Sequence, residues 1–234
     1  MAAVIALLGG GGGAGLIPEA AAAAAATLGV DGICAGVGTG PDGIVLTWGR
    51  EGISVALEEV EFTLGQGPSL DCVTAGTPVL VADLADAGAR WPAFAPAAVD
   101  LGVRAVFALP LRIGAISVGV LLAYRVTAGS LRGGQLLDAL ALADTLTVLL
   151  LRRARGEPGR AIADGAEPGP GWAAPTTHRA EVHQATGMIS VQLEVSLAEA
   201  LVRLRAHAYA NDRPLNEVAA DVVARRLRLE DPAA

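Results

Sequence analysis

The residues best suited to chemistry lie near the C-terminal end of the chain, and they are four arginines and one tyrosine. Arg205 and Tyr209 stand four positions apart, so on a helix they share a face and pair a cation with a ring that can stack. Arg225, Arg226 and Arg228 cluster further along. Guanidinium groups neutralise phosphate and aromatic rings stack on unpaired bases, so this set favours nucleic-acid binding. The competing interpretation of the clustered arginines is a favourable interaction with the negative end of a helix.

The rest of the chain shows no arrangement of residues that is typical of a catalytic site. The three histidines, His178, His183 and His207, all lie in its last quarter. Cys34 and Cys72 stand 38 positions apart, which is neither a zinc spacing nor a disulfide framework and fits a reducing compartment. We therefore predict that the protein is not an enzyme, that it has no catalytic residue, metal or cofactor, and that it is cytoplasmic.

The total charge favours neither nucleic acid nor a membrane as a partner. The chain has 234 residues and a formal net charge of −7, and residues 178–234 hold seven arginines against eight acidic residues. Any phosphate site must therefore come from local clustering of charge. The longest apolar runs are interrupted by Arg112 or by Asp138 and Asp144, so we expect no transmembrane helix.

Three short amphipathic helices are predicted between residues 178 and 230. The second opens with Ser196-Leu-Ala-Glu199, the spacing of a capping box, and the third follows Asp212-Arg-Pro214. The apolar residues expected to form their core recur at helical spacing: Leu197, Ala200, Leu201, Leu204, Ala208, Leu215, Val218, Ala219, Val222 and Val223. Small residues are expected where the helices touch: Ala185, Gly187, Ala200, Ala208 and Ala219.

Together with the run His183-Gln-Ala-Thr-Gly-Met-Ile189, these motifs resemble the ANTAR domain, a three-helix module that binds RNA and acts in transcription antitermination. The resemblance covers residues 178–230 and implies an all-α fold and a structured RNA leader with a stem-loop as partner. The RNA-binding residues would then be Arg205, Tyr209, Arg225, Arg226 and Arg228. The chain departs from the family at Thr186, where a lysine is common, and at Ser190, where an apolar residue is expected. A degenerate output domain is therefore an alternative.

A different order of elements is predicted before residue 153. The expected helices are 17–28, a short one that opens after Gly65 and closes at Gly76, one within 91–102, and a long one over 134–155. The expected strands are 32–37, 44–48, 55–62, 77–82, 104–112 and 115–124. This mixture predicts an α+β domain.

Four motifs within this order resemble a GAF domain over residues 17–152: Gly65-Gln-Gly-Pro-Ser-Leu-Asp71, Pro78-Val-Leu-Val-Ala-Asp-Leu84, Arg90-Trp-Pro-Ala-Phe94 and Leu101-Gly-Val-Arg-Ala-Val-Phe-Ala-Leu-Pro-Leu-Arg112. The resemblance implies an antiparallel sheet flanked by helices, with a pocket on one face for an unidentified small molecule. The polar residues expected to line that pocket are Gln66, Ser69, Asp71, Asp83, Trp91 and Arg104. The alternative is a purely structural or dimerising domain.

One branch of GAF proteins is enzymatic and reduces free methionine sulfoxide with pocket cysteines. Cys72 and Cys34 could serve such a reaction, but the strands over 104–124 contribute no cysteine. We therefore treat the two cysteines as small apolar residues of the core.

The remaining segments are predicted to connect or to assemble the domains. Residues 1–16 are expected to be a disordered leader, and the Gly- and Pro-rich residues 153–177 a flexible linker. The helix over 134–155 is apolar on nearly every face, which predicts a homodimer through a helical bundle, and replacing Leu146 and Leu150 with glutamate would test this helix. A monomer whose helices cover each other is the alternative.

The sequence as a whole predicts an RNA-binding transcription antitermination regulator with a GAF sensory domain. A DNA-binding helix-turn-helix would need an exposed polar recognition helix. The third C-terminal helix instead exposes two acidic residues, Glu217 and Asp221, beside Asn216, Ala220 and Ala224. RNA is therefore the preferred partner.

Overall fold

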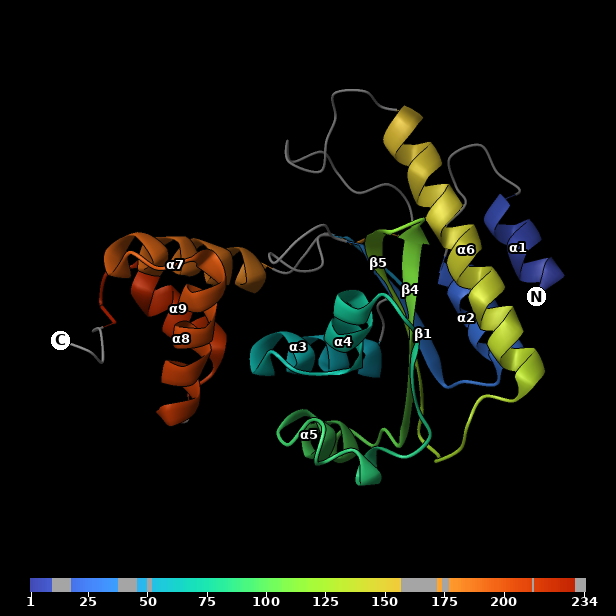
Figure 1. Ribbon diagram of the computed structural model, residues 1–234, viewed down its shortest axis with the longest axis horizontal. Coiled ribbons are helices and arrows are strands. Elements are labelled where there is room, and N and C mark those ends of the chain that lie inside the picture. The colour runs from blue at the N-terminus through green and yellow to red at the C-terminus, as the bar shows by residue number, and fades with distance from the viewer. Residues whose placement is uncertain are drawn as a thin grey trace. The chain divides into compact units, whose positions relative to one another are not determined.

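The computed structural model describes residues 1–9, 18–37, 46–49, 52–156, 172–173, 177–211 and 213–229 (Figure 1). The chain divides into two compact units. The N-terminal unit consists of Met1–Phe62 and Gln66–Ala174, and the C-terminal unit consists of Thr63–Gly65 and Pro175–Ala234.

The N-terminal unit is built on an antiparallel sheet in which six strands follow the order β3-β4-β5-β1-β2-β6. The strands are β1 (Gly32–Val37), β2 (Leu46–Trp48), β3 (Val79–Val81), β4 (Ala105–Ile113), β5 (Ile116–Arg125) and β6 (Trp172–Ala173). The longest pair, β4 and β5, forms a hairpin that turns at Gly114, whose φ of 60° suits a residue without a side chain. The antiparallel sheet confirms the predicted fold class.

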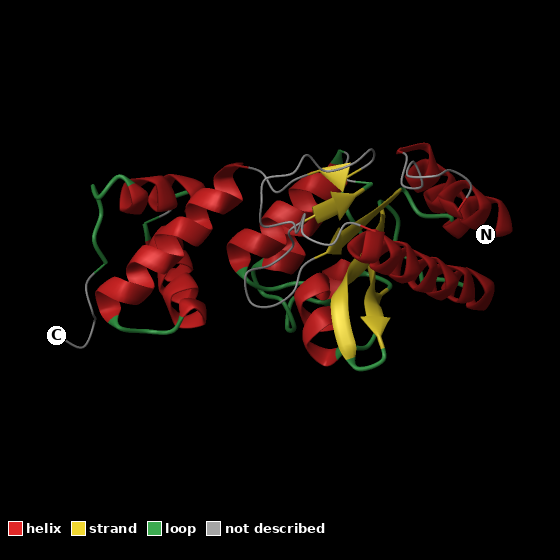
Figure 2. Cartoon of the chain, turned by 90° about the horizontal axis from the view of Figure 1, so that it is seen from above, coloured by secondary structure: helices red, strands yellow, loops and turns green. Residues whose placement is uncertain are grey.

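Helices cover both faces of this sheet, as Figures 1 and 2 show. One face carries α1 (Ala2–Gly9), α2 (Pro18–Leu28) and α6 (Gly133–Gly156). The other side carries α3 (Ile53–Leu64), α4 (Pro68–Ala75), the single turn η1 (Leu84–Asp86) and α5 (Phe94–Asp100). α4 ends at Gly76, whose φ of 64° closes the helix as the sequence predicts.

The main core lies between the sheet and the helices α1, α2 and α6. Phe107, Leu109 and Leu111 alternate along β4 and are at most 1 % exposed, because every second residue of a strand faces the same side. The alanines Ala20 and Ala24 of α2 are fully buried one turn apart. Their small side chains let the helix backbone approach the sheet closely.

The predicted strand over 55–62 is wrong, because this segment belongs to helix α3. The residues buried in α3 recur at helical spacing: Ser54, Leu57, Glu58 and Glu61. Three of these four are polar, so a search for apolar periodicity misses the helix and sees only its valines and phenylalanine. Because polar residues occupy the buried face of α3, its apolar residues do not show the helical repeat of 3.6 residues per turn.

The predicted disordered leader is also wrong for its first half. Residues 2–9 form α1, and Val4 and Leu8 are buried in the main core with 2 % and 1 % exposure. Residues 10–17 lie outside the described residues, as do 157–171 and 174–176 of the predicted linker. Within that linker, α6 continues to Gly156 and Trp172–Ala173 pairs with β2 as strand β6.

The C-terminal unit consists of three helices, α7 (Thr177–Leu193), α8 (Leu197–Ala210) and α9 (Leu215–Val223), which confirms its all-α prediction. The Ser196 side chain accepts a hydrogen bond from the Glu199 N–H at 3.2 Å, so α8 begins with the predicted cap. The helices pack through small and branched residues: Val182, Ala185, Ile189, Ala200, Leu204, Ala208, Leu215, Val218, Ala219 and Val222.

Two expectations about this three-helix core are wrong. Leu197 is 46 % exposed, because it occupies the first turn of α8 beyond the packed region. A Cβ added to Gly187 would meet no atom within 4 Å, so this glycine is not at a helix contact. The other small residues named for helix contacts, Ala185, Ala200, Ala208 and Ala219, are buried as predicted.

Among the described residues, no single helix combines the length and the apolar composition needed to cross a membrane. One bent pair, Ala180–Leu193 with Leu197–Ala210, passes that test on length and composition together, with an angle of 107° between its helices.

Candidate functional site

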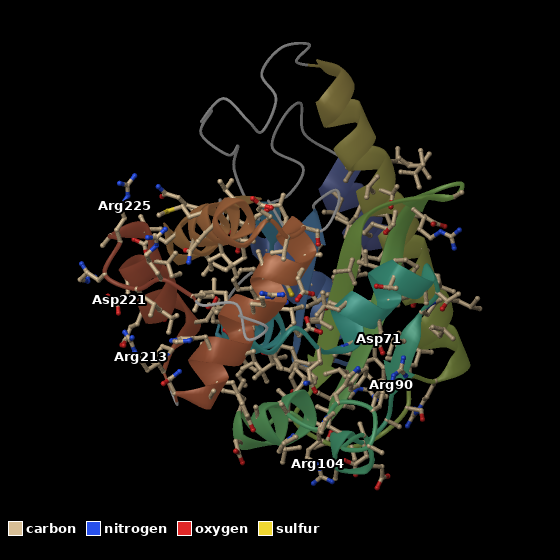
Figure 3. All side chains as sticks on the ribbon, turned by 60° about the vertical axis from the view of Figure 1, so that its left-hand side comes forward. Asp71, Arg90, Arg104, Arg213, Asp221 and Arg225 are labelled. Carbon is tan, nitrogen blue, oxygen red and sulfur yellow. The ribbon has the colours of Figure 1, made fainter. Side chains whose placement is uncertain are left out.

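The three clustered arginines follow the end of α9 and are all exposed. The chain leaves the helix through Arg225, which adopts a φ of 58°, an uncommon conformation for a residue with a side chain. The Arg226 N–H then donates to the Asp221 carbonyl oxygen at 2.8 Å and closes the turn. Figure 3 shows the Arg225 side chain directed away from the helices of its unit.

Asp221 of α9 holds two arginines that lie on either side of that helix in the sequence. Arg226 donates through Nε to Asp221 Oδ1 at 2.8 Å, and its Nη2 lies 2.7 Å from the same oxygen in an ion pair. Arg213 donates through Nη2 to Asp221 Oδ2 at 2.7 Å (Figure 3). These hydrogen bonds, first from Arg213 and then from Arg226, lower the pKa of the Asp221 carboxyl below its usual range.

Sequence reasoning did not identify Arg213 as a candidate residue of this site. It stands eight positions before Asp221 and outside α9, so no helical spacing relates the two. Only the short loop that brings the chain into α9 places the Arg213 guanidinium beside that carboxylate. The available signal was the acidic residue itself, since an acid on a surface rich in arginine is expected to pair with one.

The pair predicted on α8 lies on that helix at the expected spacing. Tyr209 is 80 % exposed and presents its ring to solvent, whereas Arg205 is half-buried. The helix ends just beyond them, where the Asn211 side chain donates to the His207 carbonyl oxygen at 2.8 Å. An exposed tyrosine near a helix end can stack on a base without unfolding its surroundings.

At the two positions that depart from the ANTAR pattern, the side chains make hydrogen bonds to backbone carbonyl oxygens within the unit. Thr186 is 5 % exposed, and its hydroxyl donates to the Val182 carbonyl oxygen at 2.7 Å. The Ser190 hydroxyl donates to the Val195 carbonyl oxygen at 2.6 Å, at the end of α7. Thr186 therefore contributes to packing in this chain, and its position presents no surface charge.

In the N-terminal unit, three of the six predicted pocket residues make hydrogen bonds around the segment that leads into α5. Asp71 Oδ2 accepts from Arg90 Nε at 2.8 Å and from Trp91 Nε1 at 3.1 Å (Figure 3). Gln66 Oε1 accepts from the backbone N–H groups of Ala93 and Phe94 and so caps α5. Trp91 itself is 2 % exposed and packs edge-on against Phe94.

The other three predicted pocket residues are placed apart from that segment. Arg104 donates to both carboxylate oxygens of Asp83, at 3.1 and 2.7 Å, and this pairing lowers the pKa of Asp83 and raises that of Arg104. Ser69 is buried, and its backbone N–H donates to Glu61 Oε1 at 2.7 Å. Five of the six side chains therefore make internal hydrogen bonds, Ser69 does so through its backbone, and their role toward a ligand stays a prediction.

The two cysteines lie near a cluster of buried polar residues that sequence reasoning missed. Ser54, Glu58 and Glu61 of α3 are all buried. Burial first, and then the charges of Glu58 and Glu61, raise the pKa of the Cys34 thiol. Burial and Glu61 raise the pKa of Cys72 to about 12. Because the thiolate is the reactive form of cysteine, this environment disfavours thiol chemistry at both positions.

The C-terminal part of the chain matches a known protein family. Residues 175–223 match the ANTAR domain, a range that includes all three helices of the C-terminal unit. The prediction of an ANTAR domain at this end of the chain is thereby confirmed. A comparison with curated proteins found no match.

Solved structures resemble the N-terminal part of the chain. The GAF domain of a phosphoenolpyruvate-protein phosphotransferase from Coxiella burnetii is 18 % identical, with a TM-score of 0.50, over 66 % of this chain and 93 % of that one. The corresponding GAF domain from Acinetobacter is 12 % identical, with a TM-score of 0.49, over 66 % and 93 %. The first of these likenesses shows that the N-terminal unit has the GAF fold. The chain thus joins a unit of GAF fold to an ANTAR domain.

Proposed function

We propose that this protein is an RNA-binding regulator of transcription that prevents termination, with its ANTAR domain as the output and its GAF unit as the sensory or dimerising part. The single observation that carries this proposal is the ANTAR match over residues 175–223, on a unit that exposes clustered arginines and a tyrosine. The partner is a structured RNA leader with a stem-loop. The proposed contacts are Arg205, Tyr209, Arg225, Arg226 and Arg228.

The chemistry of these side chains supports an RNA partner. RNA loops are recognised by bases that stack on aromatic rings and by cations that neutralise phosphate. Tyr209 supplies an exposed ring, and Arg225 and Arg228 make no ion pair with any residue that the structure describes. α9 carries Glu217 and Asp221 outside its core, which opposes insertion of this helix into the major groove of DNA.

The proposed role of the GAF unit is to hold two chains together or to receive a small molecule. Leu146 is 1 % exposed and belongs to the main core, so it is not the residue to test for a dimer. The outward face of α6 instead carries Leu137, Leu140 and Val148, which are 69 %, 37 % and 47 % exposed. A homodimer would bury this stripe.

Two other hypotheses are less well supported. Reduction of methionine sulfoxide would need a reactive thiolate, and the pKa of Cys34 and Cys72 is raised. A degenerate ANTAR domain is suggested by Thr186, but this buried residue does not remove the exposed arginines from the surface. Regulation through RNA is therefore the function that the side chains favour.

A binding measurement with the full chain tests this proposal. A short RNA hairpin with an unpaired loop is titrated at several salt concentrations. The expected result is binding whose logarithm falls linearly with the logarithm of salt, by about 0.7 per phosphate contact on unpaired RNA. The variant Arg225→Ala/Arg226→Ala/Arg228→Ala should lower that slope by about two units. An unchanged slope would assign the arginines to the helix end only.

A further inference from the structure

Asp221 connects the two segments that flank α9. Arg213 lies in the approach to the helix and Arg226 in the turn that leaves it, and each donates to a different oxygen of the same carboxylate. Two guanidinium groups repel each other at such separations, so a carboxylate between them is what allows both to occupy one small region. Figure 3 shows Arg213 and Asp221 on the same side of the C-terminal unit.

Both arginines keep donors for a further partner. Arg226 directs Nε and Nη2 at Asp221, its side chain is 65 % exposed, and its Nη1 group makes no hydrogen bond to any residue that the structure describes. Arg213 uses Nη2, and its side chain is 37 % exposed. A guanidinium carries five N–H donors in a plane, and its unused edge matches the oxygens of a phosphate group.

The segment that follows α9 is fixed at two points. Arg226 is tied to Asp221 by its side chain and by its backbone N–H. Leu229 is 6 % exposed, and its carbonyl oxygen accepts a hydrogen bond from the Gln192 side chain of α7. Arg228 lies between these anchors and is exposed. The cations are therefore presented on ordered backbone, which reduces the entropy lost when a ligand binds.

The local charge of this region differs from that of the unit as a whole. Residues 178–234 hold seven arginines against eight acidic residues. Among the described residues, however, Arg213 and Arg226 both pair with the Asp221 carboxylate at 2.7 Å, whereas Glu217 approaches Arg213 only to 3.9 Å. Two guanidinium groups that share one close carboxylate can attract an anion locally, even though the unit as a whole is near neutral.

We propose that Asp221 is a positioning residue that holds Arg213 and Arg226 as a two-guanidinium site for a phosphodiester group of RNA. This rests on the proposed function and adds Arg213 and Asp221 to its contact surface. Asp221 carries a negative charge into a phosphate-binding region. That charge is tolerated because it fixes the two cations in place.

The proposal and its simplest alternative predict opposite changes in RNA affinity when the charge of Asp221 is removed. If Asp221 only reduces the local positive charge, Asp221→Asn should strengthen RNA binding, because one negative charge near the phosphates is removed. If Asp221 positions the two arginines, the same change should weaken binding although the net charge becomes more favourable. A role limited to joining the ends of α9 would change stability and leave the salt dependence of binding unaltered.

A matched control lies in the same unit. Glu199 of α8 pairs with Arg203 at 2.9 Å, and Glu199→Gln removes one carboxylate from an arginine pair as Asp221→Asn does. The full chain and its variants are titrated with a short RNA hairpin that has an unpaired loop, between roughly 50 and 200 mM salt. Circular dichroism and thermal unfolding show whether each variant is folded.

The expected result is that Asp221→Asn weakens binding roughly tenfold, the effect of a lost charge-assisted hydrogen bond, and lowers the salt slope by about 0.7 or more. Glu199→Gln should bind as well as the wild type or better. Arg213→Ala should weaken binding and lower the slope by about 0.7, while Arg203→Ala, with the same loss of charge, should change the slope less. If Asp221→Asn does not fold, the comparison of Arg213→Ala with Arg203→Ala decides the question.

Three outcomes overturn the proposal, and they show whether the proposed function fails with it. If the wild type binds the hairpin and Asp221→Asn binds equally well or better, Asp221 does not position the arginines, and the proposed function stands. The same conclusion follows if Arg213→Ala and Arg203→Ala have equal salt slopes. If the folded wild type binds neither the hairpin nor its unpaired loop sequence, the proposed function fails together with this inference.

Discussion

The two units use arginine in different ways. In the N-terminal unit, Arg104 pairs with Asp83, and Arg125 donates to backbone carbonyls at the ends of neighbouring elements. In the C-terminal unit, Arg225 and Arg228 extend from the end of α9 without an ion pair to any described residue. Charge alone therefore does not identify a binding surface. The arginines that make no ion pair to a described residue, Arg225 and Arg228, are the most readily available to an anion.

The largest expected effect compares two double variants with the same loss of charge. Arg225→Ala/Arg228→Ala should weaken binding of an RNA hairpin by roughly tenfold to a hundredfold at low salt, because two phosphate contacts are lost. Arg90→Ala/Arg104→Ala removes two charges from the N-terminal unit, where both arginines are paired. This control should change binding little. Equal losses in titrations of both variants would contradict the proposed difference between the units.

The next effect concerns stability and the arginine most involved in the N-terminal fold. Arg125 Nε donates to the Gly29 carbonyl oxygen at 2.7 Å, Nη1 to that of Ser130 at 3.1 Å, and Nη2 to Gln135 Oε1 at 3.2 Å. One side chain thus joins the end of α2, the end of β5 and the start of α6. Arg125→Ala should lower the free energy of unfolding by about 2 kcal/mol, since several acceptors lose a charged donor.

Tryptophan fluorescence during urea unfolding measures this change. All three tryptophans belong to the N-terminal unit, so the signal reports on that unit. The matched variant Arg90→Ala removes an exposed ion pair and should cost at most about 1 kcal/mol. If Arg125→Ala unfolds at the same urea concentration as Arg90→Ala, Arg125 does not fasten these elements.

A comparable effect on binding is expected from the aromatic part of the C-terminal surface. Tyr209→Ala should weaken binding to unpaired loop bases by about 1–3 kcal/mol, the usual effect of losing one stacked base. Because Tyr209 is 80 % exposed, the thermal unfolding of the protein should change little. Tyr209→Phe keeps the ring and should keep the affinity. A Tyr209→Phe variant that loses as much affinity as Tyr209→Ala would show that the hydroxyl, and not stacking, matters.

The two units also differ in how well their sequence predicts their structure. In the C-terminal unit, apolar and small residues at helical spacing predict all three helices, and Ser196 and Glu199 mark the start of α8. In the N-terminal unit, α3 escaped the same approach, because Glu58 and Glu61 occupy its buried face. Patterns of hydrophobicity predict an element only when its buried side is apolar.

The candidate site was predicted in part, and for a related reason. The exposed arginines after α9 are close neighbours along the chain, so the sequence alone shows that they cluster. The contact between Arg213 and Asp221 depends on the path of the chain into α9, which no local pattern encodes. The six residues expected to line a GAF pocket were identified by resemblance. Their hydrogen bonds to one another and to the backbone could be assigned only from the structure.

The smallest expected effect is a change in carboxyl pKa, compared between two aspartates that are paired with arginine, one in each unit. Hydrogen bonds from Arg104 lower the pKa of Asp83, and those from Arg213 and Arg226 lower the pKa of Asp221. A carboxyl whose pKa is lower in the folded state than in the unfolded state stabilises the fold above its unfolded pKa, near 4. That contribution disappears as the pH falls through the lowered, folded pKa. In the absence of RNA, acid should therefore weaken both ion pairs as the pH falls below about 4.

RNA binding should change the pKa of Asp221 but not that of Asp83. A phosphate group that binds Arg213 and Arg226 brings negative charge toward Asp221 and competes for its hydrogen bonds, so the pKa of Asp221 should rise in the complex. Asp83 lies in the other unit, and its pKa should stay where it is. Carboxyl carbon shifts in NMR titrations of the full chain, with and without an RNA hairpin, measure both values. If RNA raises the pKa of both aspartates equally, the phosphate acts through general electrostatics and not through the Asp221 site. If RNA binds and neither pKa moves, its phosphates contact the C-terminal unit away from Asp221.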